Sequence, residues 1–174
     1  WDVGADALFE VAQAQEAAGQ GRTAAASYLR VFAEHGASRR SQRARERAEA
    51  LGATPTPEQL IQHAEGLMEA HRNQAAADLV APLVEAPPAK LAAPWRCRAR
   101  FVLGKSLRKL RRHAQAVEVL DVAVRECERD PELWGKALFV AGTSATFTRP
   151  EAAVRYYRTL ALEQPESPLA DDAL

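Results

Sequence analysis

Residues 95–131 read WRCRARFVLGKSLRKLRRHAQAVEVLDVAVRECERDP, and this stretch decides the fold. Apolar and small side chains recur in it at helical spacing on both sides of a polar break at residues 111–113. Two amphipathic helices joined by so short a break must fold back on each other as an antiparallel hairpin. Gly104 and Ala116 lie at mirrored distances from the break, so we expect the two helices to approach each other closely at these small residues.

The same spacing of small residues recurs along the chain, with a step of about forty residues after Ala64. A period of this length is typical of helical solenoids, because a hairpin buries its apolar stripe only by stacking on its neighbours. We therefore predict an all-α fold, a right-handed α-solenoid of stacked antiparallel helix pairs of the tetratricopeptide type. The alternative is an ordinary helical bundle in which alanines match the repeat spacing by chance, because alanine is abundant in the chain. The small residues of the four expected pairs are Ala12 with Ala24, Ala64 with Ala76, Gly104 with Ala116, and Gly142 with Ala153.

We expect one helical-repeat domain over residues 1–174. Thr56 and Gln59 fit a capping box at a helix start, Ser38 should cap an extra helix, and Pro82 should kink or shorten its helix. The last residues, PLADDAL, resemble the first turn of a further helix, so we expect the chain to be truncated at its C-terminal side. The expected pairs span about residues 4–36, 56–86, 92–129 and 131–164, and the extra helix spans about residues 38–51.

Composition and charge exclude several classes of protein. Aromatic residues make up only 6% of the chain, which suits closely stacked helices better than a β-sandwich. Lys and Arg total 23 and Asp and Glu total 23, so no overall charge favours nucleic acid or an anionic membrane. No apolar run approaches the roughly 18 residues of a membrane helix, and we expect no membrane span.

Cys97 and Cys127 are the only cysteines. They lie on facing sides of the hairpin and at equal distances from its turn, which makes a disulfide geometrically plausible. A disulfide would indicate an oxidising compartment. The alternative is a pair of buried thiols in a reducing cytosol.

No constellation of residues predicts catalysis in this chain. The four histidines form no metal-ligand spacing, and two cysteines without nearby histidines do not make a zinc site. No carboxylate stands in the apolar setting that a catalytic acid needs, and there is no phosphate loop or dinucleotide fingerprint. We therefore predict no catalytic residue, no cofactor and no metal site.

Basic residues line the first helix of the central hairpin with no acid between them. They are either a solvated face, favourable near a helix C-terminus, or a strip that binds acidic polymers or peptides. Interleaved aromatic residues are absent, which argues against single-stranded nucleic acid as the ligand. The candidate strip consists of Arg96, Arg100, Lys105, Arg108, Lys109 and Arg112.

The hairpin and the stretch ALFVAGTSATFTRPEAAVRYYRTLALEQPESPLADDAL, over about residues 60–174, resemble the helical superhelix of soluble lytic murein transglycosylases. The resemblance depends on Gly104, the LRKLRRHAQAVEVL turn, both cysteines and the C-terminal YYRTL and PESPLADDAL stretches. It implies a periplasmic location and a separate lysozyme-like domain, outside this chain, that cleaves glycan through one glutamate. The string at residues 65–68, EGLM, is similar to a motif of that domain but falls within a repeat helix, so no catalytic residue is carried over.

Two functions from different classes follow. The first is a non-catalytic scaffold that shapes a groove and guides peptidoglycan glycan strands to a catalytic domain elsewhere. The second is a tetratricopeptide-type adaptor of the bacterial cell envelope that binds protein partners.

Overall fold

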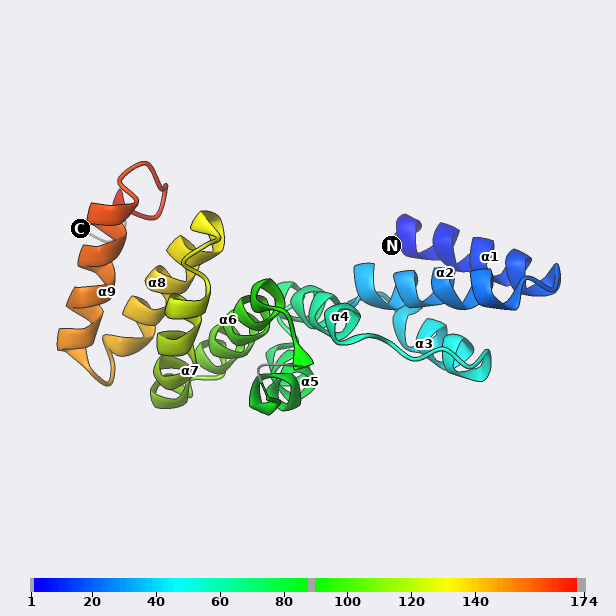
Figure 1. Ribbon diagram of the computed structural model, residues 1–174, viewed down its shortest axis with the longest axis horizontal. Helices are drawn as coiled ribbons and strands as arrows, with labels where there is room; N and C mark the ends of the chain where they lie inside the picture. The colour runs from blue at the N-terminus through cyan, green and yellow to red at the C-terminus, as the bar shows by residue number, and fades with distance from the viewer. Residues whose placement is uncertain (1, 88–89, 172–174) are drawn as a thin grey trace. The chain divides into compact units, whose positions relative to one another are not determined.

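The computed structural model describes residues 2–87 and 90–171, and this part of the chain is helical without strands (Figure 1). It divides into two compact units, residues 1–72 and residues 73–174. The N-terminal unit contains α1 (Val3–Ala17), α2 (Gly21–Glu34), α3 (Ser41–Ala50) and α4 (Pro57–Glu69). The C-terminal unit contains α5 (Asn73–Glu85), α6 (Ala93–Lys109), α7 (His113–Glu126), α8 (Pro131–Ala145) and α9 (Pro150–Glu163).

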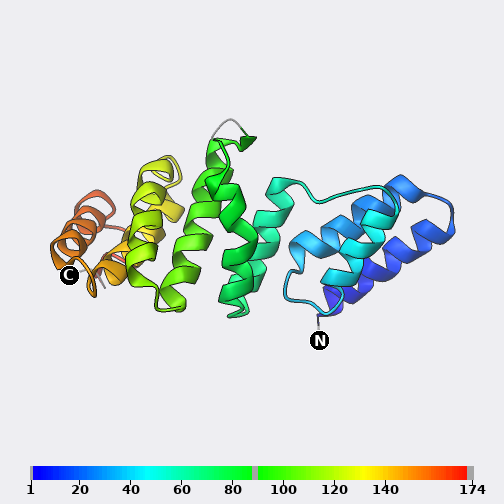
Figure 2. The same cartoon turned by 90° about the horizontal axis from the view of Figure 1, so that it is seen from below.

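Consecutive helices stack in the C-terminal unit. Each of α5 to α8 packs on the next helix along the chain, and α6 also contacts α8. Figure 2 shows these helices side by side. The hairpins expected over residues 92–129 and 131–164 are α6 with α7 and α8 with α9. This arrangement confirms the predicted all-α, solenoid-like class of fold.

The N-terminal unit is arranged around α2, which contacts α1, α3 and α4. Its core includes Phe9, Tyr28 and Val31, each fully buried, and Ala44 and Ala48 of α3 join the same cluster. The extra helix has no partner in the predicted repeat frame. In the structure α3 packs on α2, because its alanines form a narrow apolar stripe on an otherwise charged helix.

All eight small residues of the repeat frame are buried. The closest approach in the central hairpin differs from our expectation, however. A methyl group added at Gly104 would meet Leu120, with its Cδ2 at 2.7 Å, and not Ala116. Gly142 meets the ring of Tyr157 in the same way, with Cζ at 2.8 Å. Glycine is needed at these two positions because a large side chain of the second helix occupies the space beside it.

Helix ends follow the sequence in part. The capping box is confirmed, since Gln59 donates its backbone N–H to Thr56 Oγ1 at 3.3 Å and the Gln59 side chain accepts from Thr56 N at 3.0 Å. The prediction that Ser38 caps α3 is wrong. Its hydroxyl accepts from Arg40 N at 3.1 Å in a turn, and α3 begins at Ser41.

Pro82 does not cut α5 short, because the helix continues to Glu85. Proline removes one N–H donor, but its own carbonyl still accepts from Ala86 N at 3.1 Å. Packing of α5 on α6 holds the remaining turn in place. The expected end of this pair at about residue 86 lies one residue beyond the observed end of α5 at Glu85. Of the expected C-terminal helical turn, residues 172–174 lie outside the described residues.

Several helices end in the same hydrogen-bonded motif, in which one residue takes the left-handed conformation. In the turn between α6 and α7, Arg111 has φ 61°, and Arg112 N donates to Leu107 O at 2.9 Å. After α1 the equivalent residue is Gly19, with φ 74°. Arginine thus occupies a conformation that glycine adopts without steric cost.

Among residues 2–87 and 90–171, no helix combines the length and the apolar character that crossing a bilayer requires.

Candidate binding groove

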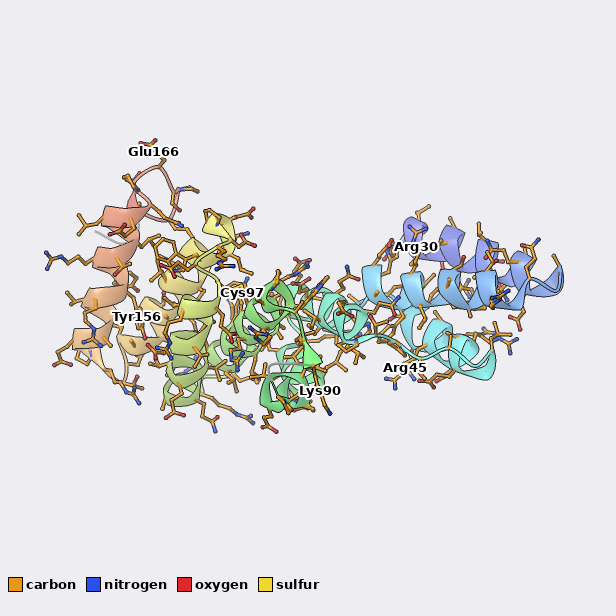
Figure 3. All side chains as sticks on the ribbon, in the orientation of Figure 1. Arg30, Arg45, Lys90, Cys97, Tyr156 and Glu166 are labelled. Carbon is orange, nitrogen blue, oxygen red and sulfur yellow. A yellow bond between two sulfur atoms is a disulfide. The ribbon has the colours of Figure 1, made fainter. Side chains whose placement is uncertain are left out.

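A disulfide joins the two helices of the central hairpin. Cys97 lies near the start of α6, Cys127 lies directly after α7, and their Cα atoms are 5.0 Å apart. Both residues are buried. Figure 3 labels Cys97, with the sulfur–sulfur bond between the two helices. The predicted disulfide is confirmed.

The C-terminal unit contains an open groove of about 1040 Å³. One face of α6 forms one wall, and α8 lies along it. The turn before α8 and the segment that follows α9 complete the lining. The α6 wall consists of Phe101, Lys105, Arg108 and Lys109, and α8 contributes Glu132, Trp134, Lys136, Phe139 and Val140.

The segment after α9 forms the far wall because it turns back towards the start of α8 (Figure 1). Gln164 donates its side-chain N–H to the Pro131 carbonyl at 2.7 Å. Gly135 leaves room for that amide, since a methyl group there would overlap the Gln164 side chain. Ser167 N then donates to Gln164 O at 2.9 Å, and Glu166 lies on the resulting turn (Figure 3).

The floor of the groove is mostly apolar. Phe101 and Val140 are buried at 6% and 9% exposure. Trp134 and Phe139 are half-buried, so part of each ring faces the groove. Phe139 is supported from behind by Tyr157, with ring centroids 6.1 Å apart. Rings held in this way offer a rigid apolar surface to a ligand.

The structure divides the six candidate basic residues into two groups. Arg96 and Arg100 form ion pairs with Glu126 at 3.4 and 2.6 Å, away from the groove. Arg112 donates to the Gln74 side chain at 3.4 Å. The other three, Lys105, Arg108 and Lys109, line the groove. Lys105 also lies 5.6 Å from the centre of the Phe101 ring.

Charges of both signs in the groove have no partner within the described part of the chain. On α6, the structure assigns no ion pair to Arg108 or Lys109, and Arg108 Nε is buried without a hydrogen-bond acceptor. Glu128, Glu163 and Glu166 also line the groove and are exposed, and the structure assigns them no ion pair among the described residues. Lys136, by contrast, pairs with Glu132 at 2.5 Å. The groove therefore has a cationic wall and an acidic wall.

The clearest pKa shifts lie outside this groove. Burial, and then its hydrogen bond to Asp121 at 2.8 Å, raise the pKa of Tyr156 to about 12. Burial would raise the pKa of Asp121, but hydrogen bonds from Arg125 and Tyr156 outweigh it and lower that pKa. These groups join α9 to α7 and serve packing.

The histidines also have structural surroundings. His63 stacks on Phe32, with ring centroids 4.0 Å apart, and its Nδ1 donates to the Phe32 carbonyl at 2.8 Å. His35 lies 3.0 Å from Asp2, and His113 packs against Phe147. Within the described ranges, no three side chains of the metal-binding types come together.

A second hollow, of about 670 Å³, lies in the N-terminal unit beside Arg40. Arg40 is already paired there with Asp6 at 2.7 Å and with Glu10 at 3.5 Å. The charge of Arg40 is thus already balanced by carboxylates of the same unit. The groove of the C-terminal unit is therefore the better candidate for a ligand site.

Sequence reasoning missed Trp134, Phe139 and the acids at residues 163 and 166. The two aromatic residues fit the helical pattern of α8 as well as any core residue, so no signal in the sequence set them apart. Glu163 is the last residue of α9, and Glu166 reaches the groove because the chain turns back after that helix. The prolines at residues 165 and 168 mark a turn, but they do not show which element the turn approaches.

No protein-family model matches the chain, and neither a curated protein nor a solved structure matches it.

Proposed function

We propose that this chain is a non-catalytic helical scaffold of the bacterial cell envelope, the superhelical segment of a periplasmic lytic transglycosylase. The observation that carries this proposal is the disulfide between α6 and α7, set in a stack of paired helices. Disulfides persist in oxidising compartments such as the periplasm. The resemblance to the lytic transglycosylase superhelix supports the same address.

In this role the stacked helices hold and orient glycan strands, and a catalytic domain outside the chain cleaves them. The test is sedimentation of the purified chain with isolated cell-wall sacculi, followed by analysis of released sugars. We expect co-sedimentation without turnover. Failure to sediment with sacculi would contradict the scaffold proposal, and released anhydro sugars would contradict the non-catalytic role.

The location is tested separately. The full-length protein is trapped in cells with a thiol-alkylating reagent before lysis, with and without prior reduction. We expect Cys97 and Cys127 to be protected from alkylation unless reductant is added. Free thiols in untreated cells would indicate a reducing compartment.

A second candidate function is a peptide-binding adaptor, and the groove favours it. Its apolar floor and partnerless charges suit an extended peptide segment better than a hydroxyl-rich sugar, because each buried sugar hydroxyl would need a hydrogen-bonding partner.

A further inference from the structure

We propose that the groove between α6, α8 and residues 163–169 binds an extended peptide segment of a partner protein, with an acidic residue at one end and apolar residues after it. This inference rests on the adaptor function. It assigns one end of the peptide to the α6 wall and the apolar part to the floor.

Arg108 indicates where the acidic residue of the peptide would bind. Arg108 and Lys109 both line the groove, and the structure assigns neither of them an ion pair among the described residues. A carboxylate in the groove would accept from this guanidinium, and Lys109, one residue along α6, would add a second positive charge. Carboxylate is the acceptor that a guanidinium binds most strongly among peptide groups.

The apolar residues are placed by the floor. Trp134 and Phe139 are half-buried and rise from one helix, beside the buried Phe101 and Val140. Aromatic side chains held by their neighbours are frequent anchors of interfaces, because they bury a large area at a small cost in conformational freedom. An extended peptide can place alternate side chains on such a floor.

The far wall sets the polarity of the ligand. Glu128 lines the groove from the turn before α8, Glu163 from the last residue of α9, and Glu166 from the segment after α9. A second negative charge at that end of the ligand would be repelled. The groove therefore fits a peptide with one acidic end and disfavours a uniform polyanion.

The experiment measures binding of short fluorescein-labelled peptides to the full chain by fluorescence anisotropy. The probe has a pair of acidic residues followed by alternating apolar residues and serines. Matched peptides replace the acidic pair with glutamines, replace it with lysines, or carry acidic pairs at both ends. We expect the probe to bind at least about tenfold more tightly than each of the three.

Variants locate the site. The double substitution Arg108→Gln and Lys109→Gln should weaken the probe by about tenfold and leave the glutamine peptide unchanged, as for groups that interact directly. The control is Arg155→Gln with Arg158→Gln, which removes the same charge from exposed positions of α9 outside the groove. Trp134→Ala should weaken all four peptides, and circular dichroism establishes that each variant is folded.

The proposal is overturned if the probe does not bind, if the lysine peptide binds as tightly, or if the α9 control weakens the probe as much as the α6 variant. It is also overturned if purified glycan strands, and not the peptides, bind with dependence on Arg108. That last result would leave the scaffold function intact, and sedimentation with sacculi tests that function independently.

Discussion

At the scale of single residues, Gly104 sets how closely α6 and α7 approach. Gly104→Ala would place a methyl group 2.7 Å from Leu120 Cδ2. We expect a loss of about 1–3 kcal/mol in the free energy of unfolding, because Leu120 is fully buried and must move. Urea denaturation measures the loss.

The matched control for this substitution is Gly21→Ala, whose added methyl group would find its nearest neighbour at 4.0 Å. It should be neutral or slightly stabilising. In the Gly104→Ala background, truncation of Leu120 should cost less than it does alone, since the clash is then relieved. Purely additive losses would contradict the contact.

Arg111 is strained in the left-handed conformation, with φ 61°. Arg111→Gly should stabilise the chain by about 0.5–1 kcal/mol, because glycine adopts this conformation without a steric penalty. Arg111→Ala removes the same charge and keeps the strain, so it should not stabilise. The reverse change, Gly19→Ala, should destabilise by about 1 kcal/mol, although no atom lies within 4 Å of the added methyl group. Equal stabilities of Arg111→Gly and Arg111→Ala in urea would show that backbone strain is not the cause.

His63 makes the N-terminal unit sensitive to acid. Burial lowers the pKa of His63 below its ordinary value of 6.5, against the opposing effect of its hydrogen bond to the Phe32 carbonyl. Between these two pKa values the unfolded chain holds a proton on His63 that the folded chain does not. Stability therefore rises with pH in this window and falls as the pH drops below about 6.5.

Urea denaturation at several pH values measures this effect. His63→Phe keeps a ring against Phe32 but cannot titrate, so its stability should fall less steeply below pH 6.5. The difference between the two profiles isolates His63 from the other histidines. Identical slopes for the variant and the parent chain would contradict the buried, neutral histidine.

At the scale of the elements, the disulfide fixes the α6–α7 hairpin. It closes a separation of 30 residues, and such a cross-link stabilises mainly by limiting the unfolded chain. Cys97→Ala with Cys127→Ala should reduce the free energy of unfolding by about 3 kcal/mol. The measurement compares denaturation of the variant with that of the parent chain, oxidised and reduced. A variant as stable as the oxidised chain would show that the disulfide does not contribute to the free energy of unfolding.

The hairpins were predictable from the sequence because small residues leave a periodic signal. Gly104 and Gly142 mark positions where one helix must admit a large side chain of the next. The partner residue was less predictable. Whether Ala116 or Leu120 lies opposite Gly104 depends on how far α7 is shifted along its own axis relative to α6, because residues four apart lie on the same face of a helix. The periodic pattern of small residues does not reveal a shift of one helical turn.

At the scale of the whole molecule, the chain divides into two compact units. The disulfide lies in the C-terminal unit and His63 in the N-terminal unit. Hydrogen exchange read by mass spectrometry should therefore separate their effects. Reductant should speed exchange in α6 and α7 and leave α2 unchanged, whereas mild acid should destabilise α2 and α4 first. Faster exchange of α2 on reduction would contradict independent units.

The candidate groove was only partly predictable from the sequence, because its residues come from several helices that meet only in the folded chain. The basic residues of α6 stood out because they lacked acids between them, yet Arg96 and Arg100 proved to be paired with Glu126, which lies far from them in the sequence. The floor and the acidic wall come from α8 and from the segment after α9. A local sequence pattern cannot predict a site whose residues are brought together only by tertiary packing.

The cross-link between α6 and α7 has a mechanical consequence. When the chain is pulled from its two ends, the residues between Cys97 and Cys127 cannot extend while the disulfide is intact. With 30 residues withheld at about 3.4 Å each, the oxidised protein would extend about 100 Å less than the reduced one. A chain held under tension at both ends would therefore keep the residues between Cys97 and Cys127 together while the helices on either side unfold.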